Sequence, residues 1–210
     1  MAADNIIAIG REAFATSDGG AHNNIAIGQQ AMGGADVAGQ GNIAMGRCSL
    51  TAITAGSSNI GMGCLSLGSG TLTGHRNIGI GECALKDLCA ASTDNVALGW
   101  QALSSATGTC FNIAIGEKAM SECVVQGDMN ISIGRGAQCR RTTGSCNIAL
   151  GQYALAAATD GNDNIALGQN ALASAVSGAN CNIAIGFRAI DSNGITGCLL
   201  YTSPSPRDRG

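Results

Sequence analysis

One short glycine-rich segment has the spacing of a nucleotide-binding loop. Residues Gly79-Ile80-Gly81-Glu82-Cys83-Ala84 satisfy the pattern G-x-G-x-x-A, whose glycines let the backbone approach the phosphates of a dinucleotide. A working loop of this kind also needs a following helix and an acidic residue about 20 positions further on. Here the segment is one copy of a phrase that recurs along the whole chain. We therefore expect no nucleotide site and no cofactor.

The residues that could bind metal or transfer protons are scattered. His22 and His75 occupy equivalent positions in a repeat, three repeats apart, so they cannot share a metal ion or a proton relay. Residues 160–163, Asp-Gly-Asn-Asp, could offer oxygen ligands to calcium, but the segment occurs once and lacks the nonapeptide repeat of calcium-binding rolls. No Ser–His–Asp arrangement and no cluster of acids and bases stands out. The sequence predicts neither an enzyme nor a metal site.

Ten cysteines raise the question of disulfides or a metal cluster. No C-x-x-C pair exists. Cys48 and Cys83 share a position in the repeat, as do Cys146 and Cys181, but each pair is two repeats apart. That separation is about 9–10 Å in stacked strands and exceeds the reach of a disulfide. We expect reduced thiols at small apolar or turn positions, although disulfides between chains or between adjacent repeats, such as Cys123 with Cys139, remain open.

Composition and charge exclude several classes of partner. The formal net charge is −3 and the sequence pI is about 5.2, with no basic cluster that would attract nucleic acid. No stretch approaches the ~20 apolar residues that a membrane-spanning helix requires, and no signal peptide precedes the first repeat. We expect no nucleic-acid binding and no direct insertion into a membrane.

The chain consists of eleven copies of one phrase, seen as DNIALGQNAL at residues 163–172. Successive copies are 17 or 18 residues apart when they are aligned on a glycine that we expect to form a tight bend with positive φ. These turn glycines are Gly10, Gly28, Gly46, Gly63, Gly81, Gly99, Gly116, Gly134, Gly151, Gly168 and Gly186.

The residues before each turn glycine alternate in size. The positions three and one before it hold Ile, Val, Leu or Met, and the position between them holds only Ala, Gly or Ser. This alternation is typical of a strand with a large-residue face and a small-residue face. We expect the large residues to form the core and the small ones to form a flat outer face against which other chains pack. That candidate oligomer face comprises Ala26, Ala44, Ala97, Ala114, Ala149, Ala166 and Ala184.

An asparagine stands four residues before the glycine in ten of the eleven repeats. Identical Asn side chains stacked on parallel strands can hydrogen-bond in a ladder. The ladder comprises Asn24, Asn42, Asn59, Asn77, Asn95, Asn112, Asn130, Asn147, Asn164 and Asn182.

A second short apolar pair follows three and four residues after the glycine, as in Ala102-Leu103, and Gln138 breaks this column once. Two short strands and two turns per 17–18 residues predict an all-β fold, a parallel β-solenoid or β-roll of about eleven coils. Coils spaced about 4.8 Å apart would give a rod on the order of 50 Å long.

The last residues depart from the repeat. Residues 198–210 contain both prolines of the chain, and leucine stands where the next ladder Asn is due. Cys198 to Asp208 match a translated transposase end from sequencing-library adapters. We therefore divide the chain into a solenoid array at 1–197, which we expect to be a metagenomic fragment of a longer protein, and a non-native, disordered tail at 198–210.

The phrase N-[IV]-A-[IL]-G-x-x-A resembles the head repeats of trimeric autotransporter adhesins of the YadA type, and related repeats of bacteriophage tail fibres. The resemblance covers residues 5 to about 197, with a period longer than that of the best-known heads. It implies a left-handed β-roll, a homotrimer, and a structural and adhesive role at the cell surface, anchored to an outer membrane, or on a virion fibre. The ligand would be an unidentified host-surface or matrix protein or glycan.

Two alternative functions follow from the same features. A bacteriophage or viral tail-fibre shaft would use the same rod. An ice- or polysaccharide-binding solenoid would need regular ranks of Thr, and no Thr column exists in the repeat.

Overall fold

The computed structural model describes residues 5–16, 20–34, 36–69, 71–88, 91–121, 125–140, 143–157, 160–174, 178–190 and 200–202. These residues form an all-β protein with twelve three-residue strands and no helix. The strands are β1 (Ile7–Ile9), β2 (Ile25–Ile27), β3 (Ile43–Met45), β4 (Ile60–Met62), β5 (Ile78–Ile80), β6 (Val96–Leu98), β7 (Ile113–Ile115), β8 (Ile131–Ile133), β9 (Ile148–Leu150), β10 (Ile165–Leu167), β11 (Ile183–Ile185) and β12 (Leu200–Thr202).

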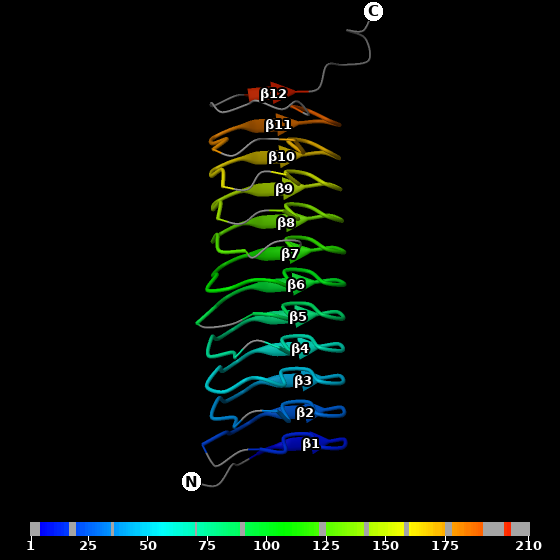
Figure 1. Ribbon diagram of the computed structural model, residues 1–210, viewed down its shortest axis with the longest axis vertical. Coiled ribbons are helices and arrows are strands. Elements are labelled where there is room, and N and C mark those ends of the chain that lie inside the picture. Colours follow the sequence, from blue (N-terminus) through cyan, green and yellow to red (C-terminus); the bar gives the residue numbers. More distant parts are fainter. Residues whose placement is uncertain are drawn as a thin grey trace, which may run out of the picture.

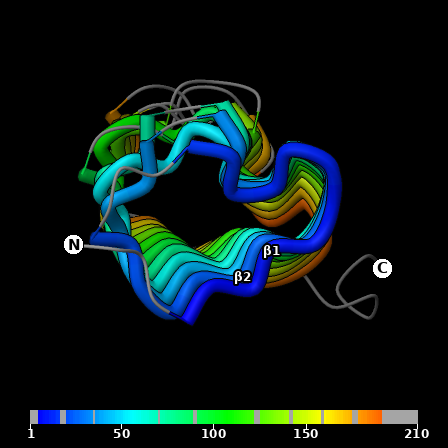
Figure 2. The backbone as a smooth tube through the Cα atoms, turned by 90° about the horizontal axis from the view of Figure 1, so that it is seen from below, coloured from blue at the N-terminus to red at the C-terminus, as the bar shows by residue number. Residues whose placement is uncertain are grey.

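Each strand pairs in parallel with the next, and the order in the sheet follows the sequence (Figure 1). Equivalent positions of the repeat are direct partners, as in Ala97↔Ala114 between β6 and β7. Viewed along the rod, successive coils superimpose as one closed outline (Figure 2). The predicted parallel β-solenoid is confirmed. We number coils 1–11 by the strand that each contains.

The expected second strand in each coil is not formed. The apolar pair after the glycine lies in a turn, because the residues two and four after the glycine adopt left-handed backbone angles, as at Gln101 (φ 53°) and Leu103 (φ 48°). The turns of adjacent coils are still joined by main-chain hydrogen bonds. For example, the N–H of Leu103 donates to the carbonyl of Ala119 on the next coil at 2.8 Å. Each described coil therefore contributes one strand and one hydrogen-bonded turn.

The prediction of which strand face is buried was wrong. The small residues point into the solenoid and the large ones point outward. The alanines expected at an outer face are all fully buried: Ala26, Ala44, Ala97, Ala114, Ala149, Ala166 and Ala184. The residues on either side of them are half-buried or exposed, with exposed fractions of 38% for Met45 beside Ala44 and 42% for Ile185 beside Ala184.

Small residues face inward because the opposite side of each coil, formed by the turn after the glycine, supplies the large side chains of the core. Leu or Met four residues after the turn glycine is fully buried in eight coils, namely Met32, Leu50, Leu67, Leu85, Leu103, Met120, Leu155 and Leu172. A Cβ added at Gly61 would lie 2.6 Å from Oγ of Ser49 and 3.2 Å from Cγ of Leu50, and one at Gly79 would lie 2.8 Å from Oγ of Ser66 and 3.5 Å from Cγ of Leu67. These two positions therefore hold glycine, and the strand side of the other coils holds nothing larger than Ala or Ser.

Gln138 interrupts this column of core residues. Its side chain is fully buried, and it separates a hydrophobic cluster that ends at Val125 from a second cluster that begins at Ala137. Its Oε1 atom has no hydrogen-bond partner, and neither has the buried Oγ of Ser132 on the strand of the same coil. Coil 8 thus carries a polar interruption inside an otherwise apolar core.

The described sheet includes one strand beyond residue 197. β12 lies within the segment that the sequence analysis assigned to a disordered tail, and it pairs in parallel with β11 through Ile183↔Leu200. Parallel pairing uses main-chain groups, so the sheet can continue into a sequence without the ladder Asn. The rest of segment 198–210 lies outside the described residues. The structure has no helix in its described part that could cross a membrane.

Candidate functional site

The ten ladder asparagines line up inside the solenoid and are at most 1% exposed. In the interior of the ladder, Oδ1 of each Asn accepts two hydrogen bonds from the next Asn, one from its main-chain N–H and one from its Nδ2. For Asn112 and Asn130 these distances are 2.9 and 3.2 Å. The Nδ2 atom also donates across the coil to a loop carbonyl, as from Asn112 to Gly127 O at 2.9 Å. The predicted ladder is confirmed as a structural element.

Every ladder Asn has a hydrogen-bond partner for its Oδ1 atom except the last one. Oδ1 of Asn182 is buried and has no hydrogen-bond partner among the described residues. Sequence position 199, where the next Asn would fall, holds leucine and lies outside the described residues.

The turn glycines also behave as predicted, for two reasons. All eleven have φ between 123° and 135°, where side chains are strongly disfavoured. A Cβ on Gly116 would in addition approach the carbonyl carbon and oxygen of Gly134 to 2.8 Å. Stacked turns therefore come so close that only glycine fits.

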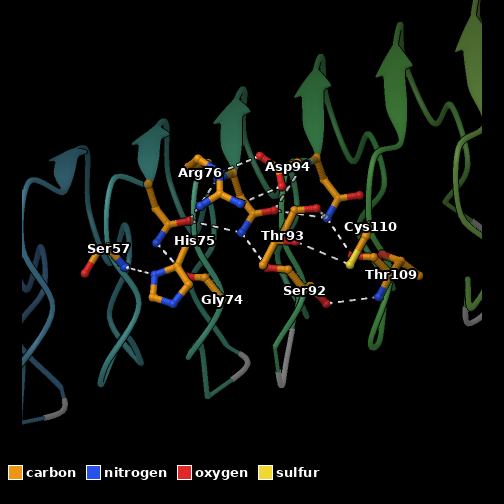
Figure 3. A network of polar contacts seen from close by, with 12 residues as sticks. Ser57, Gly74, His75, Arg76, Ser92, Thr93, Asp94, Thr109 and Cys110 are labelled. Carbon is orange, nitrogen blue, oxygen red and sulfur yellow. Dashed lines mark hydrogen bonds and ion pairs between the residues drawn. The ribbon is translucent and has the colours of Figure 1, made fainter.

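A second polar ladder, which the sequence analysis missed, runs along the position six before the turn glycine. Here the main-chain N–H of one coil donates to a side-chain acceptor on the next coil, as from Ser57 to Nδ1 of His75 at 3.0 Å (Figure 3). In the same way, the N–H of Cys110 donates to Oδ1 of Asp128 at 2.7 Å. Further links of this kind join Gln40 to Ser57, Asp128 to Ser145, Ser145 to Asn162 and Asn162 to Asn180.

In the sequence, this ladder is marked by a shared ability to accept hydrogen bonds and not by one recurring residue type. The column holds His, Gln, Ser, Thr, Cys, Asp and Asn, each able to accept a hydrogen bond. His75 belongs to this column, and its Nδ1 accepts from the backbone N–H of Ser57. The second histidine, His22, holds the same position three coils away.

One ion pair lies next to this column. Arg76 donates from Nε and Nη2 to the two carboxylate oxygens of Asp94 at 2.7 and 2.8 Å (Figure 3). The hydrogen bond from Arg76 holds the pKa of the Asp94 carboxyl below its usual value, and the pKa of Arg76 is raised in turn. Both groups are at the surface, where water and salt weaken such pairs. The pair joins coils 5 and 6.

The segments that sequence patterns suggested for chemistry do not form a reactive site. Gly79 and Gly81 lie in and after strand β5, with no helix to follow them, so they do not form a dinucleotide loop. Within the described residues, no group of three or more His, Cys, Asp or Glu side chains could hold a metal ion. Oδ1 of Asp160 accepts a hydrogen bond from the main-chain N–H of Gly178 at 2.6 Å.

The outward side of the sheet, which we call the apolar face, carries a regular array of exposed apolar side chains. It consists of the two large-residue columns of strands β1–β11, at the first and third position of each strand. Seven residues of the third position are 37–59% exposed, namely Ile9, Met45, Met62, Ile80, Ile133, Leu150 and Ile185. Eleven rows about 4.8 Å apart on strands about 10 Å long give a flat area of roughly 500 Å². The largest apolar patch on a typical monomer is about 300–600 Å² and is often functional.

The apolar face has polar borders with a few large apolar residues. On the side of the turn glycine lie charged residues such as Glu117 and Arg135, together with Trp100, which is 43% exposed and lies 5.2 Å from Nζ of Lys118. A regular apolar strip with a charged border is typical of a surface that another protein covers.

Comparisons of this chain with protein-family models, with curated proteins and with solved structures found no match.

Proposed function

We propose that the chain is a rigid structural and adhesive module that associates with copies of itself along the apolar face. The observation that carries this proposal is the double column of Ile, Leu, Val and Met on the outward side of eleven consecutive strands. Leaving these side chains in water is unfavourable, at about 25 cal/mol per Å² of apolar surface. A neighbouring copy would present the same spacing of about 4.8 Å between rows, so two faces could pack row against row.

The assembly that we propose is a homotrimer that forms the head or shaft of an attachment protein, at a cell surface or on a virion fibre. The number three comes from the resemblance to trimeric adhesin heads. The apolar face replaces the buried alanine column as the surface through which the chains meet. A host or matrix ligand, protein or glycan, would bind the remaining surface of the rod.

A charge-insertion experiment tests the role of the apolar face. The double variant Ile133→Glu and Leu150→Glu places two carboxylates on the face at residues that are 39% and 38% exposed, so the coils themselves can still form. We expect sedimentation-velocity analysis to show monomers for this variant and oligomers for the unchanged chain.

The matched control is Gln152→Glu with Gln169→Glu, which adds the same charge on the same or neighbouring coils but on the turn after the glycine. It should keep the oligomer. Equal sedimentation of the two double variants would refute the proposed interface, as would an unchanged chain that remains monomeric.

A further inference from the structure

Three cysteines occupy one edge of the solenoid on consecutive coils. Cys48, Cys64 and Cys83 lie in the turns of coils 3, 4 and 5, one or two residues after the turn glycine. All three are half-buried and none is in a disulfide. The side chains beside the three sulfur atoms differ, so the three thiols are expected to differ in reactivity.

The sulfur of Cys64 faces a cation. Nη2 of Arg47, on the preceding coil, lies 3.3 Å from Sγ of Cys64 and donates a hydrogen bond to it. A positively charged group in contact with the sulfur is a feature of reactive cysteines in proteins. Arg47 is itself exposed, so this position is open to a small reagent from solution.

Cys83 is the thiol best placed to react with Cys64 next. Its main-chain N–H donates to the carbonyl of Cys64 at 2.9 Å, so the two residues are neighbours on adjacent coils. Coils about 4.8 Å apart and an offset of one residue give a Cα separation of roughly 6 Å, which lies within the range of disulfides. Burial raises the pKa of the Cys83 thiol, which disfavours Cys83 as the first nucleophile.

The third thiol is directed elsewhere. Sγ of Cys48 lies 3.5 Å from Oε1 of Gln30 on coil 2 and donates a hydrogen bond to it. This contact draws Cys48 toward the coil on the opposite side from Cys64. The arrangement therefore favours the pair Cys64–Cys83 over the pair Cys48–Cys64.

We propose that Cys64 and Cys83 form a thiol–disulfide exchange site for low-molecular-weight disulfides, and that the exchange closes a disulfide between coils 4 and 5. The Cys64 thiolate attacks one sulfur of the reagent, whose S–S bond breaks and releases one thiolate. Cys83 then loses its proton to solvent and attacks Sγ of Cys64. The mixed disulfide breaks and the second thiolate leaves, so two protein thiols are oxidised and one reagent disulfide is reduced to two thiols.

The test treats the folded, reduced chain with oxidised glutathione at neutral pH, followed by acid quenching and peptide mapping without reduction. The expected product is a peptide pair joined through Cys64 and Cys83. In the Cys83→Ser variant, Cys64 should accumulate as a stable glutathione adduct, because no second thiol resolves it. Arg47→Met should slow modification of Cys64 about three- to tenfold, because it removes the cation beside the sulfur.

Two controls separate this site from general thiol reactivity. Cys48→Ser should leave the reaction unchanged, and the exposed Cys146 should react more slowly than Cys64. The proposal is overturned if Cys146 reacts as fast as Cys64, if Cys64 joins Cys48, or if the glutathione adduct persists when Cys83 is present. Formation of the same pair at the same rate in denaturant would also overturn it, since the selectivity would then not come from the fold.

Discussion

Oδ1 of Asn112 accepts two hydrogen bonds from Asn130, at 2.9 Å from its main-chain N–H and at 3.2 Å from its Nδ2. Asn112 also donates to the carbonyl of Gly127 across the coil. One buried side chain therefore links the strand of its own coil, the strand of the next coil and the returning segment. This geometry explains why the position holds the same residue in ten coils.

Replacement of one ladder Asn should lower the stability of the fold. Asn112→Ala leaves Gly127 O and the N–H of Asn130 buried without partners, and we expect a loss of about 2–4 kcal/mol in the free energy of unfolding. Urea denaturation followed by circular dichroism measures it. Asn162→Ala is the control, because its Oδ1 accepts from Ser145 but the residue is exposed and water can replace it. Similar losses for both variants would show that the ladder does not depend on burial.

The turn glycines should tolerate no side chain. Gly116→Ala combines a backbone angle of φ 124° with a Cβ only 2.8 Å from the next turn, and we expect a loss of roughly 3–5 kcal/mol. Gly108→Ala is the matched control, since Gly108 has φ 65° and no atom within 4 Å of an added Cβ. It should cost about 1 kcal/mol, the usual price of a left-handed alanine. Thermal unfolding of the two variants distinguishes these outcomes, and equal melting temperatures would contradict the close stacking of turns.

The interruption at Gln138 should be a stability defect. Gln138→Leu restores the apolar column and removes a buried Oε1 that has no partner, so we expect a gain of about 1–3 kcal/mol. Gln101→Leu, on a half-buried turn position, should change stability by less than about 0.5 kcal/mol. A destabilised Gln138→Leu protein would mean that this glutamine has a required role inside coil 8.

The sequence was sufficient to predict the repeat, the strand before each turn glycine and the roles of asparagine and glycine. Each of these features depends on a residue type that recurs at a fixed interval, and strands β1–β11 each run from the third to the first residue before the turn glycine. Alternation along a strand shows that two sets of side chains face opposite ways. It does not show which set is inside, because that depends on the distance to the opposite side of the coil.

The side of the coil opposite the strand determines which strand face is buried. Residues there, such as Leu50 and Leu67, fill the interior against Gly61 and Gly79. Their contacts cross the coil and depend on how the turn closes. That closure uses left-handed angles at residues such as Gln101 and Leu103, which carry no glycine-like signal. The second polar ladder could not be predicted for a different reason. Its side chains all accept hydrogen bonds, but they belong to several residue types, so no single residue type recurs in the sequence.

The reversed faces predict opposite results for two neighbouring residues. Ala114→Arg puts a long cation into the closed interior, so we expect the chain to lose its folded state. Ile115→Arg lies on the apolar face and should leave the coils folded while it prevents association. Circular dichroism reports the fold and sedimentation reports the mass. A folded, dissociated Ala114→Arg protein would restore the alanine column as the interface.

We propose that copies of the same chain cover the apolar face. The most direct test is the absolute molar mass of the unchanged protein in solution, measured by light scattering over a range of concentrations. We predict three times the chain mass of 20.8 kDa. A mass equal to that of one chain across the whole range would contradict the account.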